Sequence, residues 1–433
     1  MPLAGDRPLR ILLISRCPPY PLHLGDRLIP YHLVRELSRR DHRVDLLAFY
    51  QQPEDMADVP HYRLFFDSVT LIREPARSPL SLLTRALRPD RRFPACRERS
   101  WSPEMWDAIA DRLGNQPHKV DVVHLFGGVQ VYEFRALACA YPNLIAPYES
   151  YSLFLERALT QARHPLERAR VGLQRVMARH YESWMFSGYQ RAVVVSEQDA
   201  RTLRRLTPGL PVAVIPNGVD LERFVPTEHE PDTPTLIFTG NYDYAPNVDA
   251  ALLLIREIFP AVRRAIPEAE LLIVGHNPPA ELRRLEGGGV RVTGRVPDLR
   301  PYLDDAHVYV SPLRVGAGIK NKILEAMAMQ TAVVATPMSC DGIDIRDGRD
   351  VILAREPAEI SRAAIRLLQD AELRRRIAHH GRRLVETRYT WGHVASAYED
   401  LYSQLIREYD RSGGACPDSS RAAGMPSTRR SDR

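Results

Sequence analysis

Short apolar runs alternate with segments of helical spacing along this chain, in two successive blocks. The runs of the first block are 9–14, 43–48, 120–124, 143–146, 192–195 and 211–215. Those of the second are 235–240, 271–275, 290–294, 307–310 and 331–336. Strand–helix alternation predicts parallel sheets with helices on both faces. We therefore expect an α/β protein with two doubly wound, Rossmann-like domains, whose ligands bind at the carboxyl ends of the strands.

The joint between the two blocks is expected at Asn217-Gly218-Val219-Asp220, because Asn-Gly marks a turn and a stretch rich in Pro, Glu and Asp follows. The predicted domains are 1–219 and 220–390, with a last helix at 391–410. The tail 411–433 has almost nothing apolar and is predicted to be disordered.

Composition narrows the class of protein. The chain is 44% hydrophobic and 26% charged, as in soluble globular proteins, and its net charge of +5 does not favour nucleic acid as a partner. Its five cysteines are scattered without the spacing of a zinc site or a disulfide framework. The sequence has neither a signal-peptide core nor a run of about 18 apolar residues. These features predict a cytoplasmic location.

The lysines give the most specific local signal. The chain has three, and two of them, Lys320 and Lys322, lie in a glycine-bearing loop before a helix predicted at 323–329. Backbone N–H groups and the helix dipole at such a loop attract anions, so the pair favours a phosphate or diphosphate site. Glu325 is placed one turn into the helix to accept hydrogen bonds from sugar hydroxyls. A plain strand–helix connection with solvated charges is the alternative.

Several segments occur together in an order that resembles the retaining glycosyltransferases of family 4. They are the loop and helix at 312–329, Ser196-Glu197, 215–220 and Phe238-Thr239-Gly240. Three further segments, 241–249, 296–303 and 321–329, are similar to bacterial sugar transferases of exopolysaccharide and exosortase (PEP-CTERM)-associated gene clusters. The resemblance covers about Leu9 to Tyr409.

The resemblance implies a GT-B fold of two facing Rossmann-like domains, with a C-terminal helix that crosses back to the first. It also implies transfer of a sugar from a nucleotide diphosphate sugar to a glycan or lipid-linked acceptor, with retention of anomeric configuration, in polysaccharide or cell-surface glycan biosynthesis. No metal is expected, since no Asp-x-Asp pair is visible, and no cofactor beyond the nucleotide sugar as co-substrate.

Site residues carry over from the family position by position. The catalytic candidates are Glu325 at the donor ribose, Lys322 and Lys320 at the diphosphate, and His124 at the sugar. The donor-binding candidates are Gly240, Asn241, Gly294, Arg295, Val296, Arg314, Gly316, Gly318 and Asn321. The loop across the cleft in the first domain is Gly25, Asp26 and Arg27.

This sequence also departs from the family pattern. Ala317 stands where the family often has a first glutamate, and Phe126 where it has a second histidine after His124. A buried histidine of the core is therefore the alternative for His124. A capped helix with a surface arginine is the alternative for Arg157, which resembles a family arginine. A sugar-nucleotide epimerase and a non-catalytic sugar-nucleotide scaffold remain the alternative functions.

One basic segment, 157–191, suggests a peripheral contact with the inner face of the cell membrane. Its basic residues stand among apolar ones and include Arg163, His164, Arg168, Arg170, Arg175, Arg179 and His180. A solvated helix face is the alternative.

Overall fold

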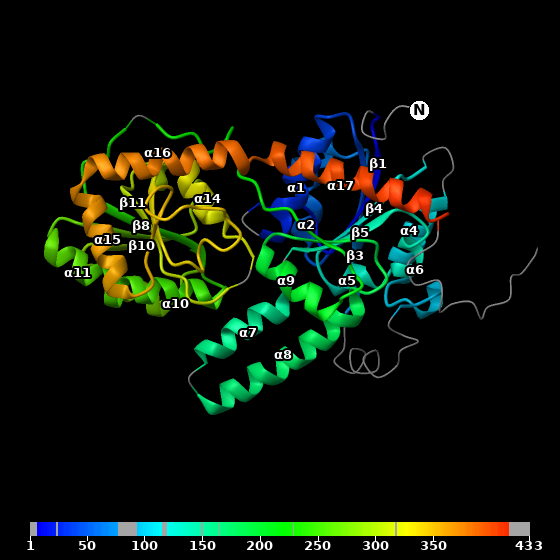
Figure 1. Cartoon of the computed structure of the whole chain (residues 1–433), viewed down its shortest axis with the longest axis horizontal. Coiled ribbons are helices and arrows are strands. Elements are labelled where there is room, and N and C mark those ends of the chain that lie inside the picture. The colour runs from blue at the N-terminus through cyan, green and yellow to red at the C-terminus, as the bar shows by residue number, and fades with distance from the viewer. Residues whose placement is uncertain are drawn as a thin grey trace, which may run out of the picture.

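Two all-parallel β-sheets form the centres of two α/β units that lie side by side (Figure 1). The computed structural model describes residues 7–22, 25–76, 93–114, 119–148, 150–162, 164–227, 229–316 and 318–414. The prediction of a disordered tail therefore falls outside the described residues beyond Gly414, as does the departure at Ala317.

The first sheet has seven strands in the order β3-β2-β1-β4-β5-β6-β7. Its strands are β1 (Arg10–Ser15), β2 (Arg43–Tyr50), β3 (Ser68–Arg73), β4 (Val122–Phe126), β5 (Asn143–Tyr148), β6 (Ala192–Val194) and β7 (Val212–Val214). The segment Ile11–Ile14 is apolar throughout because helices cover β1 on both faces of the sheet.

The second sheet has six strands in the order β10-β9-β8-β11-β12-β13. Its strands are β8 (Thr235–Asn241), β9 (Glu270–His276), β10 (Val290–Gly294), β11 (Val308–Ser311), β12 (Ala332–Ala335) and β13 (Ile352–Leu353). In both sheets the chain builds out to one edge and then returns past its first strand. The two doubly wound domains predicted from the sequence are thus confirmed.

Helices cover the faces of both sheets. Those of the first unit are α1 (Gly25–Ser38), α2 (Pro53–Ala57), α4 (Pro103–Gly114), α5 (Val129–Tyr132), α6 (Arg135–Ala138), α7 (Tyr151–Gln161), α8 (Pro165–Met185) and α9 (Glu197–Leu206). Short 3₁₀ turns occur at Val59–His61, Arg63–Phe65 and Arg97–Arg99.

The second unit has its own helices, two of them joined by the π-helical turn Leu254–Ile258. They are α10 (Ala245–Leu253), α11 (Phe259–Ala265), α12 (Ala280–Arg283), α13 (Arg300–Asp304), α14 (Asn321–Ala328), α15 (Pro357–Gln369) and α16 (Ala371–Arg388). The last helix, α17 (Trp391–Arg411), crosses back and packs on α1 and β4 of the first unit, as expected (Figure 1).

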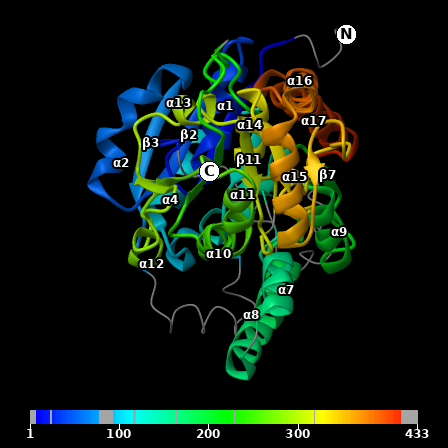
Figure 2. The ribbon, with the colours of Figure 1, turned by 90° about the vertical axis from the view of Figure 1, so that its left-hand side faces the viewer.

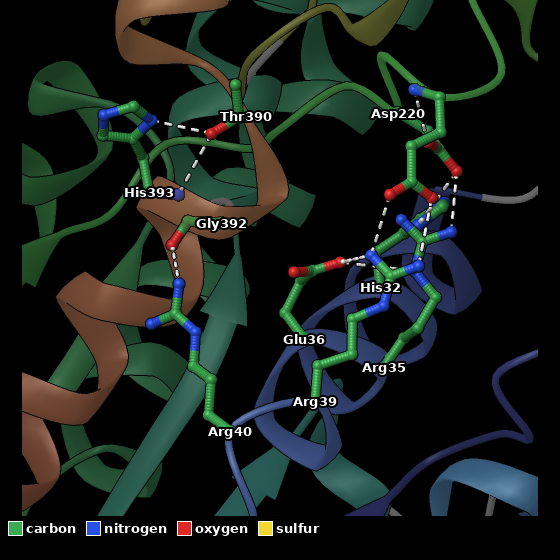
Figure 3. Close-up of polar contacts among 10 residues, drawn as sticks. His32, Arg35, Glu36, Arg39, Arg40, Asp220, Thr390, Gly392 and His393 are labelled. Carbon is green, nitrogen blue, oxygen red and sulfur yellow. Dashed lines mark hydrogen bonds and ion pairs between the residues drawn. The ribbon is translucent and has the colours of Figure 1, made fainter.

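The two crossings between the units lie next to each other. The Val219 N–H, in the connection from the first unit, donates to the carbonyl of Tyr389, just before α17, at 2.8 Å. Arg35 of α1 bonds the Asp220 carboxylate at 2.8 Å, within the polar cluster drawn in Figure 3. The first unit therefore holds the two chain crossings together.

Candidate functional site

The glycine loop lies at the point where the strand order of the second sheet reverses. β8 and β11 are neighbours, with Val308 paired to Leu236, yet the chain leaves them toward opposite edges of the sheet. Gly240 and Asn241 end β8, which the segment 242–244 follows, and the segment 312–320 follows β11. In doubly wound sheets the crevice outside such a pair of strands is the usual ligand site.

Lys322 stands in the first turn of α14 and reaches toward the end of β8. Its Nζ donates to Asn247 Oδ1 at 2.7 Å, and Asn247 Nδ2 donates to the carbonyl of Asn241 at 2.6 Å. The ammonium also lies 4.9 Å from the centre of the Phe238 ring. Burial, reinforced by the charge of Lys320, lowers the pKa of Lys322 to about 7. Asn247 was not singled out from the sequence.

Lys320 precedes α14 and runs beneath the glycine loop. It is only 9% exposed, and its Nζ donates to the carbonyl of Gly318 at 2.6 Å. A Cβ on Gly316 would stand 3.1 Å from Lys320 Cε, and the φ of Gly316 is +151°, so a side chain there would be both crowded and strained. Glycine therefore lets the loop pass close over the lysine.

Glu325 lies one turn further along α14. Burial raises the pKa of its carboxyl, while Arg223 and Lys322 act in the opposite direction. Within the described residues its side chain has no hydrogen-bond partner. The site thus brings together a carboxylate, two ammonium groups and a helix N-terminus.

The other donor-side candidates fall at the same edge of the sheet or have partners of their own. Gly294 ends β10, with Arg295 exposed and Val296 partly buried after it. Arg314 pairs with Asp249, at 3.0 Å between Nε and Oδ2. Its charge is therefore already compensated.

Asn321, the remaining donor-side candidate, ties the site to the connection between the units. Its Oδ1 accepts a hydrogen bond from Asn217 Nδ2 at 2.8 Å. Asn217 belongs to the Asn-Gly turn that the sequence marked as the domain joint. The first turn of α14 is thus fixed to the segment that joins the two units as well as to its own sheet.

An arginine of the first unit contacts the glycine loop of the second unit. Arg157 of α7 donates through Nη1 to the carbonyl of Gly316, and its Nη2 lies 2.6 Å from Asp341 Oδ2. The side chain also bonds Gln198. The Arg157 side chain lies between the units, is only 11% exposed and is not a surface side chain, although Ser150 does cap α7 as that alternative assumed.

The loop of the first unit that was expected to face the donor begins α1 at Gly25. Asp26 accepts from Arg16 Nε at 3.0 Å, and Arg27 pairs with Asp55 at 2.7 Å. Arg16 directly follows β1, at the reversal point of the first sheet. Sequence reasoning missed this arginine, which no motif marks.

His124 is the one candidate whose position contradicts its predicted role. It is buried in the middle of β4, its Nδ1 is 2.9 Å from the hydroxyl of Tyr402, and its ring stacks on Tyr398. Burial lowers its pKa to about 3. Helix α17 covers it, so His124 is a core histidine and does not contact a sugar in the cleft.

The described residues contain no group of three or more His, Cys, Asp or Glu side chains placed to hold a metal ion. None of the described helices combines the length and apolar content needed to cross a bilayer.

Two family matches correspond to the two units. Residues 30–223 match Glycosyltransferase Family 4, and residues 233–370 match Glycosyl transferases group 1. Each unit therefore matches a glycosyltransferase family over most of its length, the first unit family 4. The matches meet at the joint near Asp220 and together span most of the chain.

Curated relatives share part of their length with this chain. Phosphatidyl-myo-inositol mannosyltransferase of Mycobacterium tuberculosis is 32% identical over 216 residues, which are 46% of this chain and 54% of that protein. The chain therefore spans about half the length of the curated relatives it matches.

Solved structures share the whole fold. Sucrose-phosphate synthase of Thermosynechococcus elongatus superposes with a TM-score of 0.66 at 21% identity, over 92% of this chain and 100% of that one. Anabaena HepE in complex with UDP and glucose gives 0.60 at 13% identity, over 92% and 100%. At such identities the likeness establishes the GT-B fold.

Proposed function

We propose that this protein transfers a sugar from a nucleoside diphosphate sugar to a glycan or lipid-linked acceptor, with retention of anomeric configuration. The observation that carries the proposal is the meeting of Lys320, Lys322 and Glu325 at the reversal point of the second sheet. The names of the relatives, a mannosyltransferase and a protein crystallised with UDP and glucose, support a hexosyl donor.

The leaving diphosphate gains negative charge as the glycosidic bond breaks. Fixed positive groups that bind it more strongly in that state lower the barrier. Lys322 suits this role because its present partner, Asn247, is a neutral amide that a phosphate oxygen can replace. Arg314 suits it less, since binding a phosphate would break its ion pair with Asp249.

Glu325 would serve the other end of the nucleotide. A carboxylate without a hydrogen-bond partner inside the described protein is ready to accept from two adjacent hydroxyls of a ribose. The acceptor would enter from the first unit, and we propose a role in bacterial polysaccharide or cell-surface glycan synthesis in the cytoplasm, with closure of the two units excluding water.

The test begins with the nucleotide. Thermal unfolding is measured with UDP-, GDP- and ADP-sugars, because a ligand at about 100 times its Kd stabilises the native state by about 2.7 kcal/mol. The stabilising donor is then incubated with and without lipid-linked acceptors. Transfer to acceptor supports the proposal. Isomerisation of the donor would indicate an epimerase, binding without turnover a scaffold, and no stabilisation by any donor would overturn the assignment of the site.

A further inference from the structure

Helices α7 and α8 form a hairpin that projects from the first unit (Figures 1 and 2). The 21 residues of α8 make a rod about 30 Å long. Its base is fixed, since the buried Glu182 carboxylate accepts from the Tyr151 N–H at 2.7 Å and from Ser150 Oγ at 3.1 Å. These hydrogen bonds hold the outer face of the hairpin in a defined position relative to the first unit.

That face carries apolar side chains in water. Leu166, Leu173, Val176 and Met177 are 87%, 63%, 61% and 64% exposed. Their spacing of three, four and seven residues puts them on one side of the helix. Single exposed leucines are ordinary, but a stripe of four on one helix marks an interaction surface.

The same face is basic. Arg170 and His180 stand within the stripe and Arg179 flanks it, all of them exposed. Arg168 instead turns toward the end of α7, where its Nη1 donates to the Ala162 carbonyl at 3.3 Å. Arg170 and Arg179 form no ion pair with any described residue. Arg157 of the same basic segment is not part of this surface, because its largely covered side chain bonds the second unit.

We propose that the exposed face of α8 docks onto the surface of an anionic lipid bilayer. The apolar stripe would enter the headgroup region, and the arginines would lie among the lipid phosphates. Charge favours this occupant over a second copy of the hairpin, which would set the same unpaired arginines against each other. The inference goes beyond the proposed sugar transfer and does not depend on it.

The test is flotation of the full chain with vesicles of phosphatidylcholine alone or mixed with phosphatidylglycerol. We expect binding to the mixed vesicles only, weakened by high salt. Arg170→Gln with Arg179→Gln should lower that binding about tenfold or more, because each basic residue near an anionic surface contributes about fivefold. Leu173→Gln with Met177→Gln should also lower it.

Matched control variants show whether a loss of vesicle binding is specific to the α8 face or follows any loss of surface charge or apolar area. Arg362→Gln with Arg366→Gln changes two exposed arginines on α15, and Leu64→Gln changes a leucine that is 89% exposed. Neither should alter vesicle binding. All variants are at exposed positions, and their thermal unfolding and stabilisation by the nucleotide donor should match the parent.

Three results would overturn the proposal. One is equal binding to neutral and anionic vesicles, or none to either. Another is an equal loss in the control variants. The third is a concentration-dependent dimer of the parent that Leu173→Gln with Met177→Gln abolishes while vesicle binding persists, which would assign the face to a second copy.

Discussion

The proposed role of Lys322 predicts that the Kd for a nucleotide sugar depends on pH in a defined way. Burial and Lys320 lower its pKa to about 7, so the free protein loses this charge as the pH rises through neutrality. A bound diphosphate needs the ammonium and returns the pKa toward its ordinary value. Binding above pH 7 must therefore take up a proton, and Kd should rise about tenfold between pH 6 and pH 8 and about tenfold again by pH 9.

Isothermal titration with the nucleotide sugar measures this directly. The donor's diphosphate is esterified at both ends and does not itself titrate in this range. The change of Kd with pH therefore comes from the protein. At pH 8, titrations in buffers of different ionisation enthalpy should report an uptake of about 0.9 proton per donor.

Two lysine variants control the experiment. Lys322→Arg keeps a charge at all these pH values, so its affinity should be lower at pH 6 but nearly flat up to pH 8. Lys119→Arg changes the remaining lysine, which is exposed in the first unit, and should keep the parent slope. A parent Kd that changes less than twofold from pH 6 to pH 8, or a persisting slope in Lys322→Arg, would refute the reasoning.

Three further predictions concern the site and its closure. Glu325→Ala should lower kcat/KM about 100-fold without changing the melting temperature, because it removes a charged acceptor worth about 1.5–3 kcal/mol. Turnover close to that of the parent would contradict the proposed bond of Glu325 to the ribose. Turnover should survive excess chelator, and a loss restored by magnesium or manganese would show that a metal neutralises the diphosphate. Arg157→Ala should lower the free energy of unfolding by about 3–5 kcal/mol, as measured in denaturant, because it leaves Asp341 buried without its cation. Arg157→Ala with Asp341→Ala should recover part of that loss, and strictly additive losses would exclude the coupling.

The fold was predictable wherever strands are buried on both faces. Central strands such as β1 and β12 stand out as unbroken apolar runs, and their order along the chain predicts the two parallel sheets. The sequence reading missed β3 and β13 for a physical reason. Most residues of β3 are partly exposed at the edge of the sheet, and β13 is only two residues long, so neither makes an apolar run.

The candidate site was predictable where its residues are close in sequence. Lys320, Lys322 and Glu325 fall within one loop and one helical turn, and the scarcity of lysine marks them. Asn247 is 75 residues from Lys322, and Asp341 is 184 from Arg157, so no local pattern connects them. The predicted role of His124 at the sugar was wrong for the same reason, because its hydrogen-bond partner Tyr402 lies 278 residues further along the chain.

The glycine loop is the place where these distant contacts meet. Gly316 packs over the side chain of Lys320 below, and its carbonyl accepts a hydrogen bond from Arg157 of the first unit. A shift of α7 away from the second unit removes that bond and frees the loop, and the loop in turn covers a lysine proposed to hold the diphosphate. Through its bonds to the Gly316 carbonyl and to Asp341, Arg157 therefore couples the proposed donor site to the contact between the two units. On the proposed function this coupling is reciprocal, so a donor that orders the loop should stabilise the contact between the units by the same free energy.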